Sequence, residues 1–445
     1  MFLLFGLIIA GLLVLVFGAT VLVRGASGLA AAMGLSPLVI GLTVVAFGTS
    51  APELAVGIKA SLSGHADIAV GNVVGSNIAN IMFILGASAL VAPLLVSSRL
   101  VRLDVPALIA ASALTWFFCL DGVVTTVEGM VLTALFFAYI GLQLVLGRKE
   151  AKADSGGETE APVHGSLLFS TAQIIVGLGC LILGSEWLVD GATGLAKAME
   201  MSELVIGLTV VAMGTSFPEL ATSIIASMNN ERDIAVGNVV GSCLFNLLCI
   251  LGMTSIVSPT GVVVAQQVIG FDLPIMVGAA VVCLPIFITG SIISRWEGAL
   301  LLGAYILYTV LLVLKATGNP YFIHLSHLAV YLVLPLAAFF LLASLTKTLF
   351  KVSRFAALLG DEFDAVYQAT FLRVRRLVIF VTGMTVLLVG VIMIFLPAPA
   401  ILVIPLGLTI LATEFAWAKR LLIKVQTKLR KAFPSVAAKL FDHGQ

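Results

Sequence analysis

The chain has 445 residues, of which 60% are hydrophobic and only 11% are charged, and its mean hydropathy is +1.16. Soluble domains carry about 25% charged residues, so this composition excludes an ordinary soluble protein and indicates a membrane protein. The formal net charge of +1 provides no bulk field for binding nucleic acid. The five cysteines are an odd number in apolar segments, and they predict no disulfide framework.

Ten apolar segments follow one another along the first three quarters of the chain, each with the composition of a membrane span. The first has no basic region before it and no clear cleavage site, so we expect a span there rather than a signal peptide. The segments lie near 3–23, 36–58, 68–96, 104–120 and 127–147, and then near 167–189, 202–226, 234–257, 271–290 and 297–315.

The second five segments repeat the first five. Leu38 to Ala55 matches Leu204 to Ala221 at 16 of 18 positions, and "DIAVGNVVGS" stands unchanged at 67–76 and 233–242. Because five is odd, the second copy must enter the membrane from the opposite face, as in many secondary transporters. The sequence therefore predicts an all-α polytopic membrane protein with a ten-helix inverted-repeat (5+5) core, divided into a first repeat (1–147), a linker (148–166) and a second repeat (167–315).

A membrane extension at 316–445 is expected to add about three helices, at apolar segments near 328–346, 376–396 and 400–417. Basic residues set the orientation, because Lys and Arg accumulate in cytoplasmic loops. Arg24, Arg99, Arg148, Arg232 and Arg295 all fall on one side of the scheme. We therefore expect a multi-pass protein of the cell (inner or plasma) membrane, with the N-terminus outside and the linker and C-terminus in the cytoplasm.

Two glutamates lie inside apolar segments, Glu53 in "GLTVVAFGTSAPEL" and Glu219 in "GLTVVAMGTSFPEL". A charge at the centre of a bilayer costs ~2.5–3.5 kcal/mol, and such residues usually face the protein interior and mark ion paths. On a helix, residues three or four apart share a face. Hydroxyls therefore accompany both carboxylates, from Thr49 and Ser50 in the first repeat and from Thr215 and Ser216 in the second.

Each glutamate also follows a proline, Pro52 or Pro218. Proline has no N–H, so the carbonyl groups of Gly48 and Gly214 lose their helical partners. Each motif therefore predicts a broken helix with exposed carbonyl oxygens, which is tolerated at membrane depth only where protein or a cavity satisfies the backbone. A cation can satisfy it in the same way.

The second repeated motif adds amides and hydroxyls at intervals of four residues. These residues are Asn72, Ser76 and Asn80 in one repeat and Asn238, Ser242 and Asn246 in the other, beside GxxxG patterns that let helices approach closely. Oxygen-only ligands suit hard cations such as Na⁺ and Ca²⁺, and without thiolate or imidazole they disfavour Zn²⁺ and Cu⁺. The sequence has no Walker-type motif for ATP, and it predicts no cofactor.

The two repeats resemble the sodium/calcium exchanger family of the cation/Ca²⁺ antiporter superfamily, especially its prokaryotic members. The resemblance lies in the motifs "GTSAPEL…GNVVGSNIAN" and "GTSFPEL…GNVVGSCLFN". The resemblance implies Na⁺ and Ca²⁺ sites between the two repeats, and alternating access by sliding of the first helix of each half. Some members have aspartate where this chain has Asn80 or Asn246, so the resemblance implies no third acidic ligand. It implies a ligand set of Glu53, Glu219, Thr49, Ser50, Thr215, Ser216, Ser76, Asn80, Ser242 and Asn246, with the carbonyls of Ala46 and Ala212.

Residues 380–420 resemble a small bacterial membrane family named for a PGPGW motif. This chain has Pro397-Ala-Pro-Ala-Ile at that point, without the glycines and tryptophan of the motif. The segment is interpreted as a fused accessory or regulatory module.

The sequence thus favours a secondary antiporter that exchanges Na⁺ for Ca²⁺, with the lipid bilayer as its surroundings and no partner protein specified. A Ca²⁺/H⁺ antiporter that uses the same carboxylates stays open as the alternative. A cation channel is a distant third, because channels usually gather subunits around one pore. An enzyme is not expected, because no His or Lys accompanies Ser50 or Ser216 in these motifs to form a nucleophile–base pair.

Overall fold

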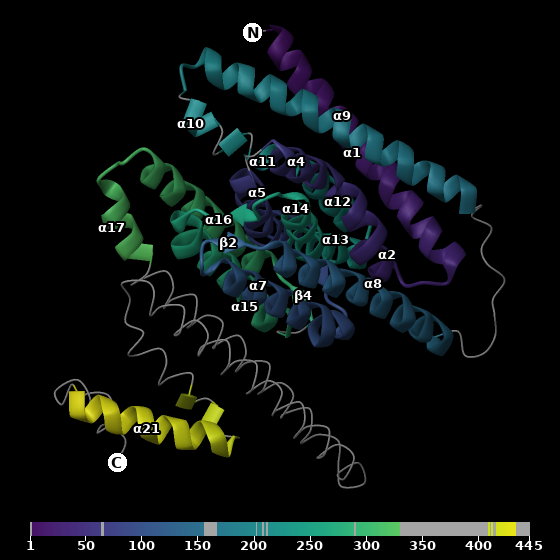
Figure 1. Ribbon diagram of the computed structural model, residues 1–445. Coiled ribbons are helices and arrows are strands. Elements are labelled where there is room, and N and C mark those ends of the chain that lie inside the picture. The colour runs from purple at the N-terminus through teal and green to yellow at the C-terminus, as the bar shows by residue number, and fades with distance from the viewer. Residues whose placement is uncertain are drawn as a thin grey trace. The chain divides into compact units, whose positions relative to one another are not determined.

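The computed structural model (Figure 1) describes residues 2–63, 66–154, 167–201, 203–206, 209–210, 212–288, 291–329, 408–409, 411–412 and 415–432. The chain divides into two compact units. The first comprises Met1–Ala280 and Ser291–Phe322, and the second comprises Val281–Gly290 and Ile323–Gln445. The first unit contains both copies of the two repeated motifs.

The first half of the chain is almost entirely helical. Its long helices are interrupted by short π-helical turns and two strands of two residues each. In chain order the elements are α1 (Phe2–Met33), α2 (Pro37–Ile40), η1 (Gly41–Val45), α3 (Ala46–Thr49), α4 (Ala51–Leu62), α5 (Ala66–Ile78), η2 (Ala79–Ile84), α6 (Leu85–Val91), β1 (Leu94–Leu95), η3 (Leu100–Asp104), α7 (Val105–Cys119), β2 (Val123–Val124) and α8 (Thr126–Asp154).

The second half repeats this order of elements, as the constant spacing of the motifs predicts. Its elements are α9 (Leu167–Ala198), α10 (Glu203–Ile206), α11 (Ala212–Gly214), α12 (Phe217–Met228), α13 (Arg232–Leu244), η5 (Phe245–Ile250), α14 (Leu251–Val257), β3 (Val262–Val263), η6 (Val268–Asp272), α15 (Leu273–Ile288), β4 (Ile292–Ile293) and α16 (Arg295–Ala316). In the described part of the remaining chain, two further helices follow, α17 (Tyr321–Leu328) and α21 (Ala416–Ala432).

Many of these helices have the length and composition of membrane spans. Within the described ranges, 8 helices are long and apolar enough to cross a membrane, and the bent pair Pro37–Thr49 and Ala51–Leu62 makes a ninth. The expected all-α polytopic fold is therefore confirmed. Helix α8 continues to Asp154, beyond the predicted end of the fifth segment at 147. The predicted segments at 328–346, 376–396 and 400–417 lie largely outside the described residues.

The first helices of the two halves, α1 and α9, run side by side as an antiparallel pair (Figure 1). Glycines spaced seven residues apart form the contact between them. A Cβ placed on Gly18 would lie 2.9 Å from the Gly177 carbonyl oxygen, and one on Gly184 would lie 2.9 Å from the Gly11 carbonyl oxygen. Backbone therefore packs on backbone along this interface, which we call the α1–α9 glycine interface.

Both proline motifs break their helices at the serine that precedes them. Ser50 has φ −91° and ψ 8°, and Ser216 has φ −90° and ψ 3°. Pro52 and Pro218 then occupy the first turns of α4 and α12. The first break bends its helix pair by 45°. The prediction of a broken helix at each repeated motif is confirmed.

In each half, a buried aspartate links the fourth helix to the fifth through hydrogen bonds. Asp104, at the end of η3, accepts a hydrogen bond of 3.0 Å from the Tyr139 hydroxyl and a further one from the Gln143 amide. Asp272, at the end of η6, accepts one of 2.8 Å from the Tyr308 hydroxyl. These carboxylates have partners from their own halves, and so they serve to hold helices together.

Two short antiparallel pairings connect the halves. Strand β1 pairs with β4, and β2 pairs with β3, so each pair takes one strand from each half. In an inverted 5+5 arrangement, the loops that carry β1 and β4 lie on one face of the membrane, and the loops that carry β2 and β3 lie on the other. Each pairing therefore joins loops that the inverted topology places on the same face.

Candidate cation site

The two glutamates of the repeated motifs occupy corresponding places, in the first turns of α4 and α12. Each side chain is 1% exposed. The spacing Ser-x-x-Glu is typical of a capping box at a helix N-terminus, but neither Ser50 nor Ser216 makes such a side-chain cap here. The Ser50 hydroxyl instead donates across to Glu219 Oε1 at 2.9 Å. This bond links the carboxylate of one half directly to the broken helix of the other.

Asn238 on α13 makes a second link between the halves. Its Oδ1 accepts a hydrogen bond of 3.1 Å from the Thr49 hydroxyl, and its Nδ2 donates to the Glu219 backbone carbonyl at 3.3 Å and to Ser223 Oγ at 3.0 Å. The sequence placed Asn238 in a polar stripe but outside the ligand set. The structure shows that its bonds fix Thr49 and the backbone of Glu219 relative to each other, so it positions the residues around it.

Several buried oxygens of the predicted ligand set make no hydrogen bond within the described part of the chain. A buried polar atom without a partner is costly and needs an explanation, such as an ion or a water. Six of the eight atoms form matching pairs from the two halves, and the other two come from the second half alone. They are Oε2 of Glu53 and Glu219, Oγ of Ser76 and Ser242, and Oδ1 of Asn80 and Asn246, together with Oγ1 of Thr215 and Oγ of Ser216.

The two carbonyl groups proposed from the resemblance differ in their surroundings. The Ala46 carbonyl accepts a backbone hydrogen bond of 3.1 Å from Ser50 and lies 3.4 Å from the Thr49 hydroxyl. One of its lone pairs is therefore already engaged. Ala212 is the first residue of α11, one turn before Thr215 and Ser216.

The two asparagines of the ligand set stand in π-helical turns. Asn80 lies in η2 and Asn246 in η5, and their carbonyls accept the backbone N–H groups of Leu85 and Leu251. Such turns are rare and frequently occur at functional sites. Helix α4 packs against η5, and α12 packs against η2. Each glutamate helix therefore lies against the asparagine segment of the opposite half.

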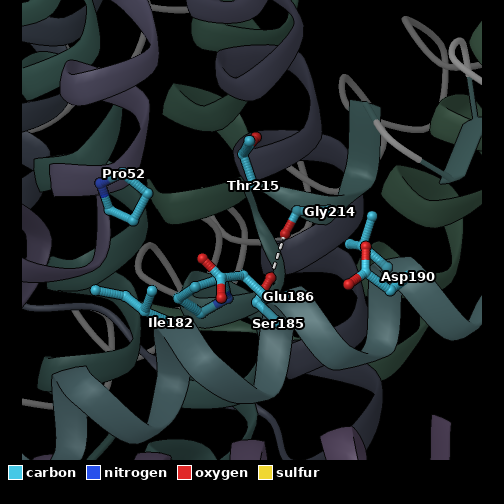
Figure 2. Close-up of a pocket in the computed structure, with 9 residues that line it drawn as sticks. Pro52, Ile182, Ser185, Glu186, Asp190, Gly214 and Thr215 are labelled. Carbon is cyan, nitrogen blue, oxygen red and sulfur yellow. Dashed lines mark hydrogen bonds between the residues drawn. The ribbon is translucent and has the colours of Figure 1, made fainter. Parts of the chain in front are cut away.

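A cavity of about 430 Å³ adjoins the broken helices on the side of α9 (Figure 2). It is lined by Pro52, Ile182, Ser185, Glu186, Val189, Asp190, Gly214, Thr215 and Pro218. The Ser185 hydroxyl donates to the Gly214 carbonyl at 2.6 Å. This is the carbonyl that Pro218 deprives of its helical partner, so α9 satisfies the backbone at the second break. The carboxylates of Glu186 and Asp190 stand on successive turns of α9 beside the cavity (Figure 2).

Sequence reasoning did not select Ser185, Glu186 or Asp190. The signal was present, because the corresponding residues of the first repeat are Ala19, Thr20 and Arg24, in an otherwise similar stretch. The two halves therefore diverge at the three α9 positions that bring polar groups to this cavity. Within the described residues, no group of three or more His, Cys, Asp or Glu side chains could hold a metal ion. A cation at the repeated motifs would thus rely on two carboxylates and neutral oxygens.

The family model described as "Sodium/calcium exchanger protein" matches residues 3–145 and 169–314. The chain belongs to the sodium/calcium exchanger family. The matched ranges cover the two copies of the repeated motifs, and the expected resemblance is confirmed. Residues 376–428 match a second family model, described as "Putative transmembrane protein (PGPGW)", which confirms the resemblance at the C-terminal end.

Curated relatives of this family are similar over most of their own length. The chain is 38% identical to "Putative antiporter CaxA" of Alkalimonas amylolytica over 311 residues, which cover 68% of this chain and 97% of that protein. It is 30% identical to "Sodium/calcium exchanger MaX1" of Methanosarcina acetivorans, covering 69% of this chain and 98% of that one. The relatives are transporters rather than enzymes, as expected.

Solved structures of the sodium-calcium exchanger NCX_Mj share the fold. One of them superposes with a TM-score of 0.60 at 31% sequence identity, covering 68% of this chain and 97% of that chain. The ten-helix exchanger core is thereby confirmed. The protein is a multi-pass membrane transporter of the cation/Ca²⁺ antiporter type.

Proposed function

We propose that this protein exchanges Na⁺ for Ca²⁺ across the membrane by alternating access at one central site. This proposal rests mainly on the paired, buried oxygens that make no hydrogen bond within the described residues. Glu53 and Glu219 supply the two carboxylate oxygens of this set. The hydrogen bond between Ser50 and Glu219 links the motif of one half to that of the other. Carboxylate, hydroxyl and amide oxygens are the ligands that Ca²⁺ prefers.

The proposed ligands are those that the family resemblance implies. Because both asparagines at the π-helical turns are neutral, the site holds two carboxylates and a charge of −2. One Ca²⁺ or two Na⁺ would balance this charge, whereas a third Na⁺ would leave a net positive charge and make exchange electrogenic. Since the same carboxylates serve both ions, binding of one ion excludes the other, and this exclusion couples their movements without ATP.

The cavity beside α9 supports an approach route to this site from one face of the membrane. With the N-terminus outside, α9 runs outward from the cytoplasm, so Glu186 and Asp190 lie in its outer half. Acidic groups at the mouth of a cleft raise the local concentration of cations and their rate of association. We infer that the structure faces outward, with this cavity as the external entrance.

The α1–α9 glycine interface supports a sliding mechanism for alternating access. Its backbone contacts recur every seven residues at Gly18 and Gly184 and at their neighbouring glycines. Such close packing lets α1 and α9 move as one body along the remaining helices. We also propose that the protein lies in the cell membrane, with its N-terminus outside and its C-terminus in the cytoplasm.

Transport by the purified protein in sealed vesicles tests the proposed function. Vesicles loaded with Na⁺ are diluted into Ca²⁺ with a protonophore present, and Ca²⁺ entry is followed over time. We expect rapid entry that depends on the Na⁺ gradient. Vesicles that carry only a proton gradient should show no entry.

A Ca²⁺/H⁺ antiporter is the second candidate. The Oε2 atoms of Glu53 and Glu219 are buried and make no hydrogen bond to any described residue, so a proton could take the place of a metal ion there. Ca²⁺ entry driven by the proton gradient and indifferent to Na⁺ would establish this alternative and overturn Na⁺ coupling.

A further inference from the structure

Helix α21 near the end of the chain is strongly basic. Its sequence is "AWAKRLLIKVQTKLRKA", and it contains no acidic residue. Its six basic residues are Lys419, Arg420, Lys424, Lys428, Arg430 and Lys431. The helix has 17 residues, and like charges this dense on an isolated helix repel one another. An oppositely charged surface would offset that repulsion.

The charges and the apolar residues of α21 lie on adjoining stripes. On a helix, residues three or four apart share a face. Arg420 and Lys424 form one stripe, and Trp417 and Leu421 form the stripe beside it. All four side chains are exposed, with Trp417 at 45% and Leu421 at 42%. An exposed aromatic and an exposed leucine beside a row of cations are not the surface of a simple solvated helix.

This combination fits an anionic lipid surface. Amphipathic helices with Lys and Arg on the polar face and Trp or Leu on the apolar face lie in the plane of the membrane interface. Lys and Arg clusters beside a membrane segment bind acidic headgroups, and Trp favours the depth of the headgroups. The neighbouring chain supports the same location, because residues 376–428 match a family described as transmembrane, and α21 overlaps the end of that match.

We propose that α21 is an interfacial helix that binds the surface of an anionic phospholipid bilayer. Arg420 and Lys424, with Lys419 on the other flank, contact headgroup phosphates, and Trp417 and Leu421 enter the boundary between headgroups and acyl chains. This interaction is independent of the exchange site, and it assigns to the C-terminal unit a membrane-surface contact of its own.

The test places a reporter on each side of the helix in the full-length protein. Leu421→Cys carries a polarity-sensitive fluorophore on the apolar stripe, and Thr427→Cys carries it on the polar side. Cys180 is replaced by Ala in both, since the other four native cysteines are buried. The labelled proteins are placed in nanodiscs of phosphatidylcholine alone, or of phosphatidylcholine mixed with phosphatidylglycerol. Acrylamide, an uncharged quencher, measures the exposure of the label.

We expect the label at 421 to shift to the blue and to lose acrylamide quenching in the anionic nanodiscs, while the label at 427 stays quenched in both. Replacing all six basic residues of the helix by glutamine should abolish the shift. Glutamine has nearly the same helix propensity as lysine and arginine, so the helix is retained. A charge-preserving control, Lys419→Arg with Lys424→Arg, should keep the shift.

Three results would overturn the proposal. The first is equal quenching at 421 in neutral and anionic nanodiscs. The second is protection that survives the replacement of all six basic residues by glutamine, because the label would then be covered without the charges. The third is protection that appears only when nucleic acid or an acidic protein is added, which would assign the basic stripe to a different class of partner.

Discussion

The two halves of this protein carry the same motifs in different surroundings. On α13, Gly237, Asn238 and Gly241 are buried, and a Cβ on Gly241 would lie 2.6 Å from the Leu42 carbonyl oxygen. On α5, the matching Gly71 is exposed, and a Cβ on Gly71 or Gly75 would meet no described atom within 4 Å. Among the described residues, identical sequence therefore packs tightly in one half and has no such contact in the other.

A similar divergence separates α1 from α9. Both keep glycines every seven residues, and so both keep the close interface between them. Where α1 has Thr20 and Arg24, however, α9 has Glu186 and Asp190 beside the cavity. The comparison shows that both halves keep the α1–α9 glycine interface and the proposed ligands, whereas acidic residues line the cavity from α9 only.

The largest loss of stability and transport is expected from substitutions at the α1–α9 glycine interface. A substitution in either half should have a similar effect there. Gly18→Leu and Gly184→Leu each force a side chain into backbone atoms closer than 3 Å. Overpacking typically costs about 1–3 kcal/mol, and more where backbone cannot yield. Both variants should lose exchange and unfold at a lower temperature, as measured by transport and by thermal unfolding in detergent.

Gly179 supplies the matched control on the same helix, because a Cβ there meets no described atom within 4 Å. Gly179→Leu should leave both readouts close to those of the native protein. If Gly179→Leu and Gly184→Leu behaved alike, the close interface would not be what holds the pair together.

A smaller effect is expected from the glycines of the second motif, where the halves should differ. Gly241→Ala pushes a methyl group against Leu42 and Ala46 and should lower the unfolding temperature. Gly75→Ala adds the same methyl group where no described atom lies within 4 Å. Alanine is favoured over glycine in a helix by about 1 kcal/mol, so this variant should be neutral or more stable. Equal destabilisation by the two changes would contradict the asymmetry.

Much of this architecture could be predicted from the sequence. The repeat predicted the inverted halves, and the prolines predicted the breaks at Ser50 and Ser216. The partners of Thr49 and Ser50 could not be predicted, because they come from the other half of the fold. The Ser-x-x-Glu spacing favoured a local cap, whereas Ser50 bonds Glu219 across the interface. Asn72 and Asn238 occupy the same position of the repeated motif "DIAVGNVVGS". Asn238 nevertheless makes three hydrogen bonds, whereas the Nδ2 of Asn72 makes none within the described residues.

The smallest effect is expected at the acidic mouth of the cavity. The double change Glu186→Gln and Asp190→Asn removes two exposed charges without touching the proposed ligands. The apparent KM for Ca²⁺ should rise roughly 10-fold at low ionic strength, at the lower end of electrostatic steering effects, with the maximal rate preserved. The difference should shrink at high salt, because exposed charges are screened.

Asp121 is an exposed carboxylate that does not line the cavity, so Asp121→Asn is the control. An equal rise in KM for Asp121→Asn would show that the effect comes from the general surface charge and not from the cavity. An unchanged KM in the double variant would remove Glu186 and Asp190 from the approach route.

The central claim is that Glu53 and Glu219, one from each half, bind Ca²⁺ and Na⁺ at a shared site. Equilibrium binding of radioactive Ca²⁺ to the purified protein tests it most directly, with Na⁺ as the competitor and with Glu53→Gln and Glu219→Gln as variants of near-identical size. The account predicts Ca²⁺ binding that Na⁺ displaces in the native protein and that is lost in either variant, while both variants keep the native unfolding profile. Ca²⁺ binding that survives either change, or that Na⁺ does not displace, would contradict it.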